Sequence, residues 1–279
     1  MIKERKHKIL DHPYVGCALL PVIAYIGLQL LSFMPGFFLG LFGMKSGVFH
    51  NVMVAILEIV LVFVMMLFYK YWFQYRFRGC FIDEGIEYGL SIVMAPTVFF
   101  VALNVISLLF QGHITAPIYA IIMGCSPGIA EEVMFRGFGL SNAMRKVETK
   151  KEMVICVIIS AAVFGCIHFV NLLVGAGFIL TLGQVFYAFG LGLIYGLAYV
   201  CSGSLIPCAI AHSLIDVSAY LGTSISDSSG ILQQTNLEST IVSSIISVIL
   251  GLICIGFCIF VIQKMDVENI KDTWKRIWR

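Results

Sequence analysis

Long apolar runs recur along this chain and are separated by short segments that hold most of its polar residues. A transmembrane helix needs about 20 mainly apolar residues to cross ~30 Å of hydrocarbon, and about eight runs approach that length. The pattern therefore predicts an all-α fold, a polytopic transmembrane helical bundle that forms a single integral membrane domain over residues 1–279. The expected spans lie near residues 14–34, 49–69, 86–110, 117–142, 152–171, 182–201, 205–222 and 239–263.

The basic residues predict how these spans are oriented. Lys and Arg precede the first span or follow the second, fourth and last spans, and only Lys45 and Arg136 fall elsewhere. Loops 111–116, 172–181 and 223–238 contain no Lys or Arg. Because cytosolic loops carry an excess of Lys and Arg, both termini are predicted to be cytosolic, after eight crossings. We expect a multi-pass protein of the cell membrane.

The composition agrees with a membrane protein. Charged residues make up 12% of the chain, whereas soluble globular proteins carry roughly 25%. The nine cysteines show no paired-ligand spacing, and we expect them to pack in the bundle rather than to form disulfides or bind metal. Residues 264–279 place Ile270, Trp274 and Ile277 at helical spacing opposite Lys and Arg, which predicts a cytosolic amphipathic tail on the inner leaflet.

Charged residues interrupt the fourth span at Glu131, Glu132 and Arg136. We expect Ser126 and Pro127 to begin the helix that carries them. Glu132 and Arg136 are four residues apart, so they lie on one face of the helix and can form a salt bridge. Glu131 is turned about 100° away from Glu132 and is left for another role. A structural ion pair explains the first two residues, but a second buried carboxylate points to function.

Two of the six histidines lie inside apolar runs, His168 in the fifth span and His212 in the seventh, where Asp216 follows one turn later. A lone buried histidine is commonly a packed core residue. Two of them, with carboxylates, on separate helices can instead activate water and stabilise an oxyanion. The same groups could also be the N and O ligands of a divalent cation such as Zn²⁺, and Glu131, His168, His212 and Asp216 are then the candidate ligands.

Three motifs in order make the chain resemble the CAAX protease and bacteriocin-processing (CPBP, or Abi) family of intramembrane proteases. They are EExxxR at Glu131–Arg136, FxxxH at Phe164–His168, and HxxxD at His212–Asp216. The resemblance covers about residues 115–220, which we expect to be the catalytic core. It implies a peptide or protein substrate, and no nucleic-acid partner is expected.

The resemblance also implies a role for each motif residue. Glu131 and His168 would hold and activate the attacking water, and Glu132 and Arg136 would be a supporting pair. His212 and Asp216 would stabilise the oxyanion. Many members of the family have Asn in place of Asp216, so this carboxyl is either protonated, or orients His212, or helps to bind a cation. Both metalloprotease and metal-free descriptions of the family are in use, and the cofactor stays open.

Two other functions compete with this interpretation. One is a non-proteolytic bacteriocin-immunity protein that binds a peptide in the same fold. The other is a transporter that uses Glu131, Glu132 and His168 as a proton relay, which the absence of evident internal repeats disfavours. Gly192 and Gly196 form a GxxxG motif that predicts a close helix contact.

Helix length predicts where the site lies in the membrane. At ~1.5 Å per residue, Glu131 lies roughly 21 Å from Arg145, and His168 roughly 25 Å from Lys151. His212 follows the connection Ser202–Ser204 by only a few residues. One shared site therefore requires this connection to be submerged, and we expect a cavity that opens to the cytosol.

Overall fold

The computed structural model describes residues 12–42, 47–72, 80–111, 114, 116–222 and 237–278, and all regular structure within them is helical. The all-α prediction is thus confirmed. The helices are α1 Pro13–Leu41, α2 Val48–Trp72, α3 Ile86–Gln111, α4 Pro117–Glu132, η1 Val133–Leu140, α5 Ser141–Met144, α6 Lys150–Ile167, η2 His168–Val174, α7 Phe178–Ser202, α8 Ile206–Leu221, α9 Leu237–Lys264 and α10 Val267–Ile277.

Seven helical segments in these residues are long and apolar enough to cross a membrane, and α8 is a shorter apolar helix. The fourth segment runs through α4, η1 and α5, and the fifth through α6 and most of η2. Each expected span therefore has a helical counterpart, but the expected start of the fourth helix is wrong. α4 begins at Pro117, and Pro127 lies inside it, while Ser126 Oγ donates to the backbone oxygen of Ala55 on α2 at 2.5 Å.

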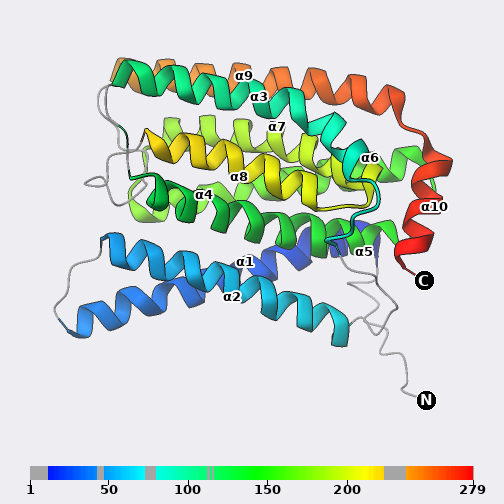
Figure 1. Cartoon of the computed structure of the whole chain (residues 1–279), viewed down its shortest axis with the longest axis horizontal. Coiled ribbons are helices and arrows are strands. Elements are labelled where there is room, and N and C mark those ends of the chain that lie inside the picture. Colours follow the sequence, from blue (N-terminus) through cyan, green and yellow to red (C-terminus); the bar gives the residue numbers. More distant parts are fainter. Residues whose placement is uncertain are drawn as a thin grey trace.

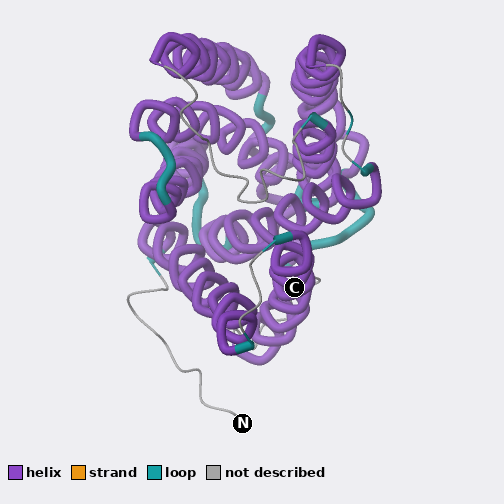
Figure 2. Tube along the Cα trace, turned by 90° about the vertical axis from the view of Figure 1, so that its left-hand side faces the viewer, coloured by secondary structure: helices purple, strands orange, loops and turns teal. Residues whose placement is uncertain are grey.

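The helices form three layers, seen side-on in Figure 1 and turned by 90° in Figure 2. α4, α6, α7 and α8 make up the middle layer, α1 and α2 pack on one side of it, and α3 and α9 pack on the other. α4 contacts α8, and α6 contacts α7, so the segments that carry the three motifs are neighbours in the middle layer.

Small residues allow the middle helices to approach closely. A methyl group added at Gly192 would meet Ala161 Cα at 3.1 Å, and one at Gly196 would meet Val157 Cγ1 at 2.9 Å. Both contacts join α7 to α6, so the close contact predicted from GxxxG is confirmed. On the other side of the site, a methyl at Gly128 on α4 would lie 2.8 Å from the backbone nitrogen of Ser213 on α8.

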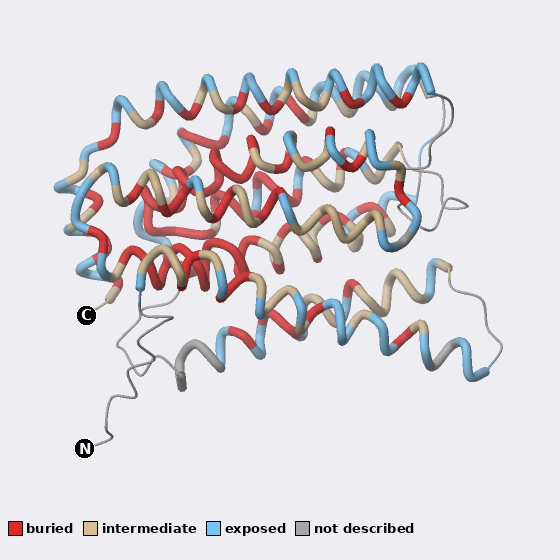
Figure 3. The backbone as a smooth tube through the Cα atoms, turned by 180° about the vertical axis from the view of Figure 1, so that it is seen from behind, coloured by how far each residue is buried: buried red, intermediate tan, exposed pale blue. Residues whose placement is uncertain are grey.

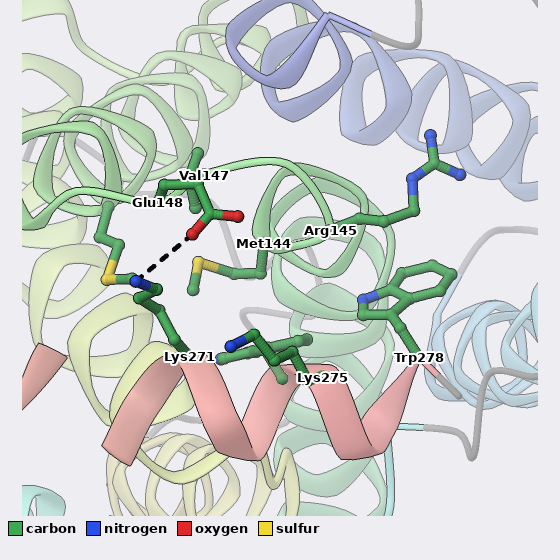
Figure 4. A pocket seen from close by; sticks show the side chains of 9 residues that line it. Met144, Arg145, Val147, Glu148, Lys271, Lys275 and Trp278 are labelled. Atoms are coloured by element: carbon green, nitrogen blue, oxygen red, sulfur yellow. Dashed lines mark ion pairs between the residues drawn. The ribbon is translucent and has the colours of Figure 1, made fainter. Parts of the chain in front are cut away.

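The C-terminal helix α10 lies across the end of this bundle (Figure 1). Ile270, Trp274 and Ile277 are buried, and Trp274 Nε1 donates to the backbone oxygen of Val200 at 2.8 Å. A surface pocket lies between α10 and the residues that follow α5, and Lys271 of α10 pairs with Glu148 at 3.4 Å beside it (Figure 4). The apolar face of α10 thus packs on the protein itself.

The connection between α7 and α8 lies beneath α10. Ser202, Ser204 and Leu205 are buried, and Ser204 Oγ donates to the backbone oxygen of Ile82 at 2.5 Å. Gly203 has φ of 74°, and a methyl there would collide with Ile277 of α10. The connection is therefore buried within the protein, and its depth in the membrane stays a prediction.

Candidate active site

Glu131 and Glu132 end α4, and the chain continues directly into the π-helix η1. Wide π-helical turns are rare and occur frequently at functional sites. Glu132 is fully buried, whereas 19% of the Glu131 side chain is exposed. The two carboxyl groups therefore have different surroundings, as the 100° turn between them predicts. The π-helix was not foreseen, because the apolar run through residues 133–140 reads equally well as an α-helix.

Arg136 projects from the π-helix into a fully buried pocket. Its Nη1 donates to Glu132 Oε1 at 2.9 Å, and its Nη2 donates to the backbone oxygen of Gly192 at 3.1 Å. The guanidinium also lies over the Phe164 ring, 4.7 Å from its centroid, and 5.5 Å from that of Tyr195. The predicted salt bridge is thus present, and it ties the fourth segment to α6 and α7. An ion pair this deeply buried needs such further donors and acceptors to offset the loss of hydration.

His212 of α8 lies between the two carboxyl groups. Its Nδ1 donates to Glu132 Oε1 at 2.9 Å, and its Nε2 lies 3.8 Å from Glu131 Oε2. The ring stacks on Tyr195, with 5.2 Å between centroids. A histidine held through Nδ1 by a carboxylate has a fixed ring orientation and presents Nε2 to whatever binds beside it.

His168 stands where α6 gives way to η2, and its ring is only partly buried. Its Nδ1 lies 2.9 Å from the backbone oxygen of Phe164. Because a carbonyl can only accept, Nδ1 carries the proton in this contact, and Nε2 of the neutral ring remains as an acceptor. The Phe164 ring stands edge-on between the two histidines, 5.4 Å from His168 and 5.8 Å from His212.

Asp216 lies one turn after His212 on α8. Its Oδ2 is 3.6 Å from His212 Nε2, a separation too long for a hydrogen bond but short enough for charge attraction. The side chain is 28% exposed, the most accessible of the acidic groups here. Of the three alternatives for Asp216, this contact favours interaction with His212.

These residues share a cavity of about 330 Å³. A cavity of this size holds several water molecules. Glu131, His168, His212 and Asp216 all line it, while Glu132 and Arg136 lie behind its wall. The lining also includes side chains that were not anticipated from sequence: Tyr25, Asn171, Gln184, Tyr187 and Tyr220. Asn171 and Gln184, which are polar residues near the ends of apolar runs, could have been suspected.

The cavity lies in the half of the bundle away from the α7–α8 connection. Asn171 belongs to η2, Gln184 to the second turn of α7, and Tyr220 to the last turn of α8. All three are near the end of the bundle opposite α10. The α7–α8 connection lies at the other end and is covered by α10.

The residues described do not fit a metal centre. Among them, no group of three or more His, Cys, Asp or Glu side chains has the geometry to hold an ion. The four candidate ligands are therefore treated below as acid–base and hydrogen-bonding groups.

A scan against protein-family models matches residues 113–218 to the type II CAAX prenyl endopeptidase Rce1-like family. The chain carries an Rce1-like domain. The match holds all three motifs, and it runs from just before α4 to near the end of α8. No curated protein and no solved structure matches the chain. The family resemblance drawn from the motifs is confirmed, and the Rce1-like domain supports an intramembrane endopeptidase in a multi-pass membrane protein.

Proposed function

We propose that this protein hydrolyses peptide bonds with a water molecule held between Glu131 and His168. The supporting observation is that Glu131, His168, His212 and Asp216, from three separate membrane segments, line one cavity. Ionisable side chains inside a membrane usually mark a working site rather than a packing feature.

Glu131 is the proposed general base. It is the partly exposed member of the carboxyl pair, so a water in the cavity can reach it, whereas Glu132 is sealed behind it. His168 Nε2 accepts the second hydrogen bond of that water and so aims its oxygen lone pair at the substrate carbonyl. Glu131 removes the water proton as the C–O bond forms.

His212 is the proposed oxyanion group. Glu132 holds its Nδ1, and Glu131 and Asp216 flank its Nε2 with negative charge, an arrangement that favours the imidazolium. Its Nε2–H then donates to the oxygen that becomes negative in the tetrahedral intermediate. When the intermediate collapses, the C–N bond breaks, and the proton held by Glu131 passes to the leaving amine. Water and peptide are thereby converted to a carboxylic acid and an amine.

The test compares cleavage by three variants in cells. Membrane proteins from cells producing wild type, Glu131→Gln, His168→Ala or Glu148→Gln are labelled at their N-termini and analysed by mass spectrometry. Glu148 is the control, an exposed carboxylate that pairs with Lys271 far from the cavity. Loss of a general base costs about 10²–10⁴-fold in rate, so termini seen with wild type and Glu148→Gln should vanish with Glu131→Gln and fall with His168→Ala.

Three results would contradict the proposal. Identical termini from wild type and Glu131→Gln would remove Glu131 from the mechanism. Absence of new termini in every sample, together with stable capture of a peptide, would favour the immunity function. Loss of wild-type cleavage with a chelator, and its recovery with Zn²⁺, would show that a metal takes part in the step.

A further inference from the structure

The active-site cavity occupies one half of the bundle. Its outer residues, Asn171, Gln184 and Tyr220, lie within two turns of the ends of η2, α7 and α8 that are farthest from α10. Asn171 Nδ2 donates to Gln184 Oε1 at 2.8 Å, and Ala219, which also lines the cavity, is exposed. A row of polar side chains therefore leads from Glu131 in mid-membrane to this end of the bundle.

The other half of the bundle is packed solid. Every residue from Glu132 to Met144 is buried, and so is every residue of α7 from Gly190 to Ser202. Figure 3 shows this as a concentration of buried backbone toward the C-terminal end, with more accessible backbone beyond it. Tyr195, Tyr199 and Leu140 are among the large side chains that fill this half. Water or peptide would have to displace them to reach Glu131 from that end.

α10 adds a second barrier on the same side. It covers the α7–α8 connection through Ile277 and Thr273, which contact the position of Gly203, and Trp274 is bonded to Val200. The end that is packed solid is therefore also the end that is capped.

The charge distribution assigns this capped end to the cytosol. Arg145, Lys146, Lys150 and Lys151 follow the fourth segment there, and the basic residues of α10 lie beside them. The loops at the cavity end, by contrast, include 172–181 and 223–238, which contain no Lys or Arg. By the positive-inside rule the cavity end is non-cytosolic.

A second intramembrane cavity lies in the same half. It measures about 390 Å³ between α1, α2 and α4, and its polar lining residues are Gln29, Ser32, His50, Asn51 and Glu58. These positions fall in the last half of α1 and the first half of α2, the halves away from α10. Polar side chains and hollows are thus gathered on the non-cytosolic side of both helix layers.

We propose that the active site receives its substrate from the non-cytosolic side of the membrane. The substrate class is then an extended peptide segment of a secreted or membrane-anchored protein, exposed at the outer face or lying in the outer leaflet. A prenylated C-terminal tail on the cytosolic leaflet would face the packed end and α10. The substrate class rests on the proposed function, whereas the side on which the cavity opens does not.

Cysteine labelling tests the opening without using activity. Gln184→Cys and Ala219→Cys place thiols on the cavity lining, and Lys275→Cys places one on the exposed face of α10. Each variant is made in the wild-type and the Glu131→Gln chain, in a bacterial host. Spheroplasts and inside-out vesicles are treated with a membrane-impermeant cationic methanethiosulfonate, and labelled peptides are identified by mass spectrometry, with the unmodified chain as background.

Both cavity thiols should react in spheroplasts, and Lys275→Cys should react only in inside-out vesicles, equally in both chains. Reaction of the cavity thiols only in inside-out vesicles would overturn the proposal, and so would no reaction in either preparation. The new N-termini from the cleavage experiment should fall in non-cytosolic segments, and a majority in cytosolic segments would also overturn it. Outward labelling together with cleavage that does not depend on Glu131 would defeat the proposed function alone.

Discussion

Replacing Arg136 with Met should destabilise the protein strongly, because it leaves a buried carboxylate without its cation. Arg136 and Glu132 are both completely buried and lie 2.9 Å apart. Removing one partner of such a pair typically costs about 3–5 kcal/mol. His212 still donates to Glu132 in this variant, so we expect a loss near the lower figure. Met retains most of the volume of the side chain, which limits the contribution from a cavity.

Thermal unfolding of the purified protein in detergent measures this effect. At about 2–4 °C per kcal/mol for chains of this size, a loss of about 3 kcal/mol lowers Tm by roughly 6–12 °C. Arg276→Met is the matched control, since Arg276 is half-exposed and its pair with Glu84 spans 3.9 Å. An exposed ion pair contributes about 0–1 kcal/mol, so this variant should melt within a few degrees of wild type.

A double variant separates charge from packing. Glu132→Gln together with Arg136→Met removes the unpaired charge and should be more stable than Arg136→Met alone. The reasoning is refuted if Arg136→Met melts like Arg276→Met, or if the double variant melts below Arg136→Met.

Three further predictions concern packing, the oxyanion and the C-terminal helix. Gly128→Ala should lower the free energy of unfolding by about 1–3 kcal/mol in a thermal melt, because the added methyl meets the backbone of α8. Gly256→Ala is the control and should cost far less, since nothing among the described residues lies within 4 Å of the added methyl. Equal losses of stability would contradict the close approach of α4 and α8. Asp216→Asn should reduce cleavage in the N-terminal labelling assay, because it removes negative charge that favours the His212 imidazolium, and Asp216→Glu should retain more activity than Asp216→Asn. Full activity of Asp216→Asn would show that this charge is not needed. Trp274→Phe should raise the rate of amide hydrogen exchange at the α7–α8 connection, because the variant loses the hydrogen bond to Val200 that holds α10 in place. An unchanged exchange rate would show that other contacts hold α10.

Much of the fold was predictable because apolar length and helical spacing depend on local sequence alone. The spans, the Glu132–Arg136 pair and the family resemblance all follow from short segments of the chain. The π-helix was not predictable, since its residues are as apolar as those of an α-helix. Nor was the start of α4, because Ser126 and Pro127 resemble a helix start but lie inside a longer helix.

The direction of the cavity required tertiary structure. Counting residues from the nearest cytosolic charge placed Glu131 and His168 deep in the membrane, but it could not tell which half of the bundle is filled. That depends on long-range contacts, such as α10 over the α7–α8 connection and Arg136 with Gly192. The role of His212 also became clearer, because Glu132 is hydrogen-bonded to His212 as well as to Arg136.

The shortness of α8 has a consequence for how the chain is inserted during synthesis. With 16 residues it reaches about 24 Å at ~1.5 Å per residue, less than the hydrocarbon thickness, and it carries His212 and Asp216. An Asp near the centre of an inserting helix disfavours insertion by about 2.5–3.5 kcal/mol. We therefore expect that α8 does not pass from the translocon into the bilayer as a single helix. Cys208 of α8 already donates to Tyr195 of α7, and Asn104 of α3 donates to the backbone oxygen of Ile215. We therefore expect α7 and α8 to enter the bilayer as a hairpin that docks on helices made earlier, so that the hydrolytic site is assembled only when this hairpin arrives.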